Sequence, residues 1–212
     1  MTVSIPPNRR YTLDEYLELE AKSPHEKFEY REGIVINMRE ALAMAGGSSE
    51  HAVITVNISS GIHSRLKGRD CRVYSPDARV RIPKSTLYTY PDVGVVCGEP
   101  QVDSDRFGVQ TLLNPNLIVE VLSPSTEDYD RGRKFELYRE ISSLREYVVV
   151  WQTQPRVQTF FRRDDGGWSF DAFAGMDAVA KLLSLNIELP LSEVYANVTL
   201  PPQPPEPETG PV

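Results

Sequence analysis

Two short apolar segments that flank one predicted helix constrain the fold of this chain most. The first segment runs from Leu117 to Leu122 and the second from Glu146 to Trp151. Continuous apolar, β-branched runs of this length are typical of strands buried on both faces of a sheet. The residues between them, from Ser125 or Thr126 to about Ile141, carry acids in the first turn, which favours a helix. A strand, a helix and a strand in this order predict a right-handed crossover.

Other local patterns extend this unit to a mixed sheet flanked by helices. Thr12 and Glu15 form a capping box, which predicts a helix that ends before Pro24. Isoleucines spaced by four residues predict a second helix from about Ser49. We expect further strands or hairpins at Phe28 to Met38, Cys71 to Ser75, Ala78 to Ile82, Asp92 to Cys97, Arg156 to Arg162 and Gly167 to Phe173. We expect a short last helix at Leu191 to Ala196. The predicted class is α/β (α+β) with an antiparallel C-terminal hairpin extension.

Length and composition fit a single domain. The chain has 212 residues, of which 40% are hydrophobic, and the formal net charge is −7. We expect one domain at residues 11–199, between a loose N-terminus at residues 1–10 and a proline-rich disordered tail at residues 200–212. The apolar runs are too short to span a membrane, and the first residues lack a secretory signal, so we expect a cytoplasmic protein. The negative charge argues against a protein that coats DNA non-specifically and restricts any phosphate-binding surface to a patch.

The two cysteines, Cys71 and Cys97, each lie in an apolar, strand-like stretch. A free cysteine in such a stretch behaves as a small hydrophobic residue. There is no CxxC motif for structural zinc. We therefore expect two buried thiols and no disulfide.

The most informative residue is Glu120, which lies inside the apolar run from Leu117 to Leu122. A buried carboxylate is costly unless a cation, a metal or strong donors compensate it. Asp92 heads another predicted strand, after Pro91. Two carboxylates on neighbouring strands repel each other unless a proton or cation lies between them. The alternatives are a Glu120 that is exposed or paired with an arginine, and an Asp92 that belongs only to a turn.

Asp77 and Glu29 are further candidate acids. Asp77 follows Ser75-Pro76, where a turn role is as plausible as a functional one. Glu29 lies between two aromatic residues, so it either joins the acidic cluster or faces solvent.

Cations come from the predicted helix that follows Glu120. Arg131, Lys134 and Tyr138 are spaced by three and four residues, which places them on one helix face, so Lys134 could reach Glu120. The alternative is a solvated basic stripe. His51 and His63 are too far apart on their helix for a zinc motif of the HExxH type.

These residues carry a family resemblance. The segments 89–98 and 118–126, followed by Asp130, Lys134 and Tyr138, resemble the Uma-two family, a branch of the PD-(D/E)XK restriction-endonuclease-like superfamily. The resemblance implies an αβββαβ core, a divalent metal bound by Asp92 and Glu120, and phosphodiester hydrolysis. The superfamily lysine two residues after the glutamate is replaced here by Leu122, and Lys134 resembles a migrated replacement.

The resemblance and the oxygen donors together define the expected site. Oxygen ligands favour Mg²⁺ or Mn²⁺ over Zn²⁺. We expect Asp92, Glu120, Lys134 and Glu29 to be catalytic, and Asp92, Glu120 and Asp77 to bind the metal. The leading hypothesis is a Mg²⁺-dependent endonuclease that acts on DNA as a homodimer, for example by pairing of Val157 to Phe161 across a two-fold axis. The alternatives are a nucleic-acid-binding or regulatory module that no longer cleaves, and a structural interaction protein.

Overall fold

The structure is a computed structural model that describes residues 5–6, 9–38, 49–82, 86–124 and 127–202. The predicted helix start at Ser125 or Thr126 and the chain beyond residue 202 lie outside the described residues. The strands are β1 (Phe28–Arg31), β2 (Ile34–Asn37), β3 (Cys71–Tyr74), β4 (Val80–Ile82), β5 (Leu87–Thr89), β6 (Val93–Cys97), β7 (Val102–Ser104), β8 (Gln110–Leu112), β9 (Leu117–Leu122), β10 (Glu146–Trp151), β11 (Arg156–Arg162), β12 (Trp168–Ala174), β13 (Val179–Leu182) and β14 (Ile187–Pro190). The helical segments are α1 (Leu13–Lys22), α3 (Ser49–Arg65), α4 (Glu127–Tyr129), the π-helical turn η1 (Asp130–Lys134), α5 (Phe135–Tyr138) and α6 (Leu191–Val194).

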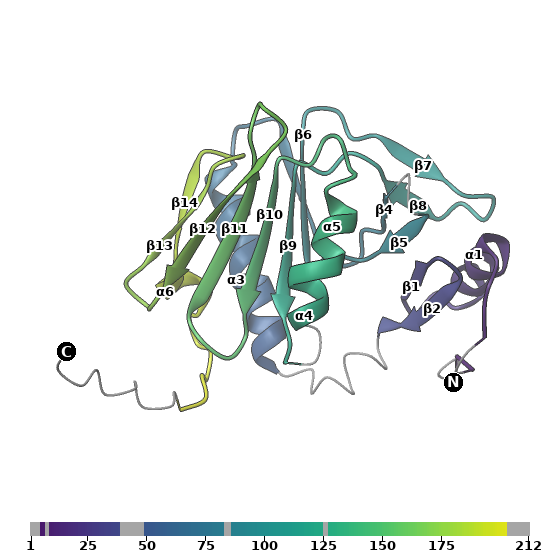
Figure 1. The fold of residues 1–212 in the computed structure, drawn as a ribbon, viewed down its shortest axis with the longest axis horizontal. Helices are drawn as coiled ribbons and strands as arrows, with labels where there is room; N and C mark the ends of the chain where they lie inside the picture. The colour runs from purple at the N-terminus through teal and green to yellow at the C-terminus, as the bar shows by residue number, and fades with distance from the viewer. Residues whose placement is uncertain (1–4, 7–8, 39–48, 83–85, 125–126, 203–212) are drawn as a thin grey trace.

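The main sheet has six strands in the order β12-β11-β10-β9-β6-β3. Strands β9 and β10 are parallel neighbours, with Val119 opposite Val148, while their other neighbours in this sheet run antiparallel. The connection between β9 and β10 passes through α4, η1 and α5, which lie across one face of the sheet (Figure 1). The predicted strand–helix–strand crossover is therefore confirmed.

A second sheet of six strands, in the order β2-β1-β5-β4-β8-β7, adjoins the main one. The mixed sheet expected from the sequence is present, but a second sheet accompanies it, because β4 pairs with β5 and β8 and not with β3. Alternation of apolar and polar residues reveals which face of a strand is buried but not which sheet it joins. Strands β5, β7 and β8 are three residues long and carry too little periodicity to be recognised. The hairpin β13–β14 was also missed.

Apolar residues fill both sides of the main sheet. On one side, Ile54, Ile58 and Ile62 of α3 pack against β6, β9 and β10, so the predicted isoleucine stripe is confirmed. On the other side, Tyr138 of α5 and Leu87 of the second sheet pack against the same strands. Burial of each such side chain contributes about 1.5–3 kcal/mol. The sheet that carries Asp92 and Glu120 is thus held rigidly between two layers.

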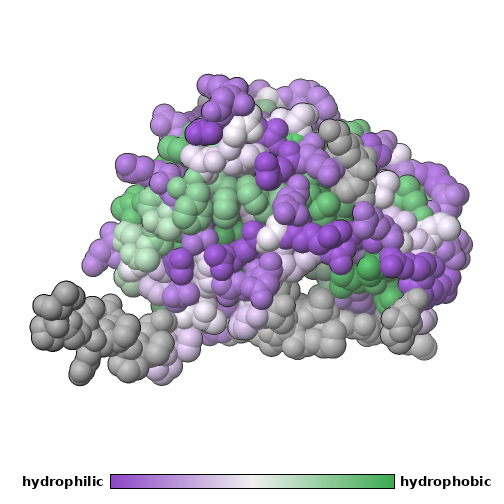
Figure 2. Space-filling model, viewed as in Figure 1, coloured by the Kyte–Doolittle hydropathy of each residue, from purple (hydrophilic) through white to green (hydrophobic). Residues whose placement is uncertain are grey.

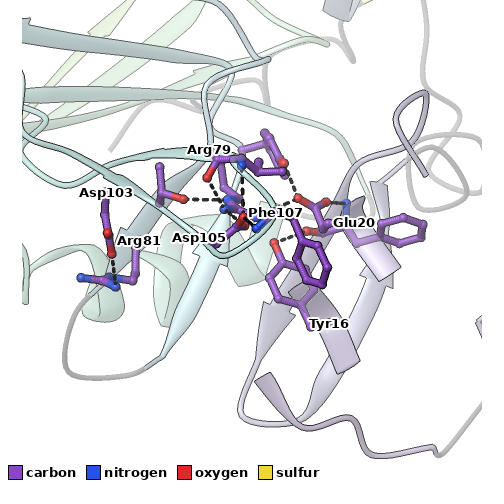
Figure 3. Close-up of polar contacts among 11 residues, drawn as sticks. Tyr16, Glu20, Arg79, Arg81, Asp103, Asp105 and Phe107 are labelled. Atoms are coloured by element: carbon purple, nitrogen blue, oxygen red, sulfur yellow. Dashed lines mark hydrogen bonds and ion pairs between the residues drawn. The ribbon is translucent and has the colours of Figure 1, made fainter. Parts of the chain in front are cut away.

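The N-terminal helix α1 is fixed at both ends. Thr12 caps it through the predicted box with Glu15, whose carboxylate accepts from the Thr12 main chain at 2.8 Å. At its other end Glu20 accepts a hydrogen bond from the buried guanidinium of Arg79 at 3.1 Å. Arg79 also donates to Asp105 at 2.7 Å, so the guanidinium lies between α1 and the turn after β7 (Figure 3). This buried network attaches α1 to the second sheet.

Cys71 and Cys97 form a disulfide, so the expectation of two free thiols is wrong. The two residues lie directly opposite each other on the antiparallel strands β3 and β6. This register depends on strand pairing between residues that are 26 apart in sequence, and local sequence does not specify it. None of the helices among the described residues has the length and apolar character needed to cross a membrane.

The proposed pairing of Val157 to Phe161 with a second copy does not fit the sheet. Strand β11 is hydrogen-bonded to β10 on one side and to β12 on the other, so it has no open edge. The edge strands of this sheet are β12, where Phe170 is 53% exposed, and β3. Figure 2 shows mostly polar residues on this view, with a pale green apolar area in its left half. A homodimer remains a proposal without an interface at β11.

Candidate active site

Strands β6 and β9 bring Asp92 and Glu120 together. In this antiparallel pair Val93 lies opposite Val119, and Gly94 opposite Ile118. Continued by one position, the same register places Asp92 opposite Glu120. Directly opposed residues of antiparallel strands point to the same face of a sheet. The side chains of the two acids therefore lie on one side, as the sequence predicted.

Glu120 is 5% exposed and accepts two hydrogen bonds through one oxygen. Its Oε1 lies 2.9 Å from Nζ of Lys134 and 2.8 Å from the hydroxyl oxygen of Tyr138, which donates to it. Both donors come from the helical segment that covers the sheet, as the spacing of Lys134 and Tyr138 predicted. Because both bind Oε1, they orient the carboxylate while Oε2 makes no hydrogen bond to a described residue.

Lys134 lies among three acids and contacts each of them. Besides Glu120, its Nζ lies 3.4 Å from Asp130 Oδ1 and 3.5 Å from Glu29 Oε1. Glu29 on β1 is 4% exposed and accepts a short hydrogen bond from the Thr89 hydroxyl. Glu29 thus joins the cluster, which was one of the two alternatives that the sequence left open.

The turn that carries Lys134 is π-helical. Its first and last residues, Asp130 and Lys134, are buried, whereas Arg131 is exposed and pairs with Glu127 at 3.3 Å. The prediction that Arg131 shares a face with Lys134 is wrong. A π-helical turn is wider than an α-helical one, so residues four apart align better than residues three apart. Asp130 therefore takes the position expected for Arg131. It is a site residue that sequence spacing missed.

Asp92 lies at the partly open side of the cluster, with its side chain 16% exposed. Its Oδ2 accepts a hydrogen bond of 2.7 Å from the main-chain nitrogen of Val121 and lies 3.4 Å from Nε2 of His51. Burial alone would lower the pKa of His51, but Asp92 and the main chain of Val121 outweigh this and raise the pKa. His51 was not assigned to the site from sequence, because its only signal was a place in the first turn of a helix.

The electrostatics of the cluster show an excess of acids. Burial raises the pKa of Glu120 to about 8, with a smaller contribution from Asp130 and Asp92, against the lowering effect of Lys134. Burial alone would lower the pKa of Lys134, but the charges of Glu120 and Glu29 raise it well above its usual range. Lys134 is therefore held protonated and does not balance the acids by itself. Such a cluster favours a further cation or a bound proton.

This donor set fits a divalent metal with an incomplete protein shell. Among the described residues, no three Asp, Glu, His or Cys side chains converge closely enough to enclose an ion. Mg²⁺ commonly takes only one or two carboxylates and completes its shell with water and substrate phosphate. Asp92 and Glu120 each bind protein donors through one oxygen, so each retains a second oxygen for such an ion.

Asp77 is not part of this cluster. Its side chain is 80% exposed and forms an ion pair of 2.5 Å with Lys27. Its other hydrogen bonds are with Ser75, two residues earlier in the same turn. Asp77 is therefore a turn residue, which was one of the two alternatives that the sequence left open. Its position gives no support to a role of Asp77 as a metal ligand.

Comparison with known proteins shows what this chain is similar to. Residues 13–192 match the model of the Uma2 family, described as "Putative restriction endonuclease". An uncharacterized protein of Synechocystis, slr1290, is 36% identical over 189 residues, which cover 89% of this chain and 93% of the relative. A second Synechocystis protein, sll1609, is 34% identical over 79% of this chain and 89% of its own.

A solved structure has the same fold. It is described as a "putative nuclease belonging to DUF820" from Anabaena variabilis, and it aligns with a TM-score of 0.66 over 87% of this chain and 97% of its own. At 20% identity this likeness concerns the fold alone. The mixed sheet with its crossover is thus a restriction-endonuclease-like core, as predicted. With a family match over most of its length, the chain belongs to the Uma2 family of restriction-endonuclease-like proteins.

Proposed function

We propose that this protein is a divalent-metal-dependent endonuclease that hydrolyses phosphodiester bonds of DNA. The observation that carries the proposal is the contact of 2.9 Å between Lys134 and Glu120. The superfamily usually carries a lysine at the strand position that Leu122 occupies here. In this protein Lys134, from the helical segment, brings an ammonium group to the same glutamate. Membership of a family described as restriction endonucleases supports a nucleic-acid substrate.

Asp92 and Glu120 are the proposed ligands of Mg²⁺ or Mn²⁺. A bound divalent ion supplies positive charge that polarises a phosphate and lowers the pKa of a water molecule. Tyr138 and Lys134 orient Glu120 by binding Oε1, and the Val121 main chain orients Asp92 by binding Oδ2.

Lys134 has a proposed role of its own. Its ammonium group is suited to position an attacking water and to neutralise charge that develops on the phosphate. Glu29 and Asp130 hold this group at 3.5 and 3.4 Å, and they keep it charged. On the outer side of the same turn, Arg131 and Arg133 are exposed and pair with Glu127 and Glu32 at 3.3 and 3.7 Å, so a DNA phosphate would compete with these carboxylates for them.

A second candidate is a nucleic-acid-binding module that does not cleave. It is favoured by the number of carboxylates around Lys134, because an ammonium group shared among three acids is less available to a substrate. Both candidates predict DNA binding, and only the first predicts metal-dependent cleavage.

The test is cleavage of supercoiled plasmid with Mg²⁺ or Mn²⁺. We expect Asp92→Ala, Glu120→Ala and Lys134→Ala each to lower the cleavage rate by about 100-fold or more. Asp77→Ala is the matched control, since it removes an exposed acid outside the cluster, and it should retain the wild-type rate. DNA binding without metal-dependent cleavage would replace the first candidate by the second. Equal cleavage by all four variants would overturn the assigned site.

Two further properties are part of the proposal. Cutting both strands is simplest with two copies of the site, so we propose a homodimer, to be checked by sedimentation. Action on DNA also suggests a cytoplasmic location. Disulfides are uncommon there, and Cys71 and Cys97 should then be at least partly reduced in cells.

A further inference from the structure

A strip of the main sheet lies beside α5, on the side away from the candidate active site. Lys134 turns toward Glu29 of β1, whereas its neighbour Phe135 packs on Phe160 of β11, with ring centres 4.4 Å apart. In the view of Figures 1 and 2, β11 and β12 lie to the left of α5, where the surface is pale green and is bordered by hydrophilic residues. The strip is therefore a surface separate from the acidic cluster.

Aromatic side chains cover this strip. Phe160 of β11 lies directly opposite Phe170 of β12, and their ring centres are 5.4 Å apart. Trp168, two residues before Phe170 on the same side of β12, contacts Phe135 edge-on at 5.1 Å. Phe170 lies at the border of this cluster and is 53% exposed. A ring that is fixed by other rings and half open to solvent can receive a further planar group by stacking.

Three arginines lie around these rings. The guanidinium carbons lie 4.8–5.7 Å from the centre of an aromatic ring in Arg139, Arg156 and Arg162. A guanidinium group that lies over an aromatic ring still donates from its edge, and its planar fork suits a phosphate group. We call these three arginines, together with Phe160, Trp168 and Phe170, the arginine–aromatic face.

The charges of the arginine–aromatic face lack acidic partners. The arginines that form no ion pair with a described Asp or Glu side chain include Arg139, Arg156 and Arg162. Burial lowers the pKa of Arg162, and the charges of Arg145 and Arg139 lower it further. Asp171, the acid of β12, lies on the opposite side of the sheet, because side chains alternate along a strand. Like charges that have no counterion attract an anion.

We propose that the arginine–aromatic face binds a single-stranded segment of DNA, with phosphates on the arginines and a base stacked on Phe170. The inference rests on the nucleic-acid substrate of the proposed function and adds a binding surface outside the candidate active site. An unpaired base offers its flat side to an exposed ring, whereas a base inside a duplex is already stacked. A second copy of this chain is a poorer occupant, because a symmetric contact would bring the same arginines together.

The experiment measures DNA binding by the full chain in the presence of a metal chelator, so that cleavage plays no part. Fluorescence anisotropy of a labelled single strand gives the dissociation constant. We expect Phe170→Ala to raise it by roughly 5- to 100-fold, the effect of losing one stacked base, and to change binding of the matching duplex by less than about twofold. Phe107→Ala is the control, because Phe107 is 44% exposed on the turn after β7, and it should bind as the wild type does.

The phosphate contacts are tested by the salt dependence of binding. Arg139→Gln and Arg156→Gln should each lower the slope of the logarithm of affinity against the logarithm of salt concentration by about 0.7, the contribution of one phosphate of a single strand. Arg72→Gln removes an exposed arginine of β3, at the opposite edge of the main sheet, and should leave the slope unchanged. Ultraviolet crosslinking of the wild-type chain to a bromouracil-containing strand needs no variant, and the crosslinked peptide should contain β12.

The outcomes separate this inference from the proposed function. If the wild type binds the single strand and the variants of the arginine–aromatic face bind it equally well, the face is overturned and the nucleic-acid substrate stands. Equal weakening of single-strand and duplex binding in Phe170→Ala overturns the stacked base. A dimer that Phe170→Ala dissociates in sedimentation, with unchanged DNA affinity, shows that the face joins two copies of the chain. If the wild type binds no DNA, the nucleic-acid substrate of the proposed function fails as well.

Discussion

The buried carboxylate of Glu120 should make the protein less stable than a neutral residue would. Its pKa is raised from 4.5 to about 8, chiefly by burial. When the pKa of a carboxyl group is higher in the folded state than in the unfolded state, the folded state binds the proton more tightly. The resulting stability is complete below the unfolded-state pKa and is lost as the pH rises through the folded-state pKa. Glu120→Gln removes this pH dependence. We therefore predict that the variant, without metal, is more stable than the wild type at alkaline pH.

The magnitude follows from the same pKa. The pKa of Glu120 is raised from 4.5 to about 8. At about 1.4 kcal/mol per pKa unit, the loss of unfolding free energy at alkaline pH is about 5 kcal/mol at most. The pKa of about 8 already includes the attraction of Lys134, so about 5 kcal/mol is an upper limit, and Glu29 and Asp130 still compensate the ammonium group in the variant. We expect a net gain of about 2 kcal/mol at about pH 9, and a difference below about 1 kcal/mol at about pH 4.

Urea unfolding with a metal chelator, at several pH values, measures this difference. Glu136→Gln is the matched control, since Glu136 is exposed on α5, and it should change the unfolding free energy by less than about 0.5 kcal/mol at every pH. If Glu120→Gln is less stable than the wild type at about pH 9, the ion pair with Lys134 outweighs burial and the reasoning is refuted.

Three further predictions concern the contacts that hold the site and the fold. Tyr138→Phe removes a donor to the buried Glu120 carboxylate and should lower the unfolding free energy, measured in urea, by about 1.5–3 kcal/mol. The loss should be smaller in the Glu120→Gln background, and equal losses in the two backgrounds would contradict the contact. Arg79→Met leaves two acids uncompensated and should lower the unfolding free energy by about 3–5 kcal/mol, whereas the exposed pair of Arg81 should be worth less than about 1 kcal/mol in Arg81→Met. Reduction of the disulfide, which closes a loop of 26 residues, should lower the unfolding free energy by about 3.5 kcal/mol, and no change with dithiothreitol would contradict a bond in the folded protein.

Much of the main sheet could be predicted because its signals are local. The apolar run of β9, the β-branched run of β10 and the acids between them each occupy a few consecutive residues. The same locality reveals an acid in an apolar strand, so Glu120 and Asp92 can be recognised as candidates from the sequence. The spacing of Lys134 and Tyr138 on one helix face was enough to bring both to Glu120.

The parts that were missed depend on contacts between distant residues. The Thr89 hydroxyl meets Glu29 across 60 positions, and the main chain of Val121 meets Asp92 across 29. Periodicity within a segment carries no information on such distances. The turn role of Asp77 had a local signal, but local sequence could not decide between that role and a metal ligand.

The amino-acid sequence by itself determined where the strands and helices of the main sheet lie, and which acids they bury. Backbone propensity and the pattern of apolar residues act within a few positions and are written in the chain directly. Only the tertiary structure decided that β4 joins a second sheet, that Cys71 faces Cys97, and that a widened turn substitutes Asp130 for Arg131. These outcomes follow from strand register and helix geometry, which the packing of the whole molecule selects among several alternatives that the local sequence tolerates equally.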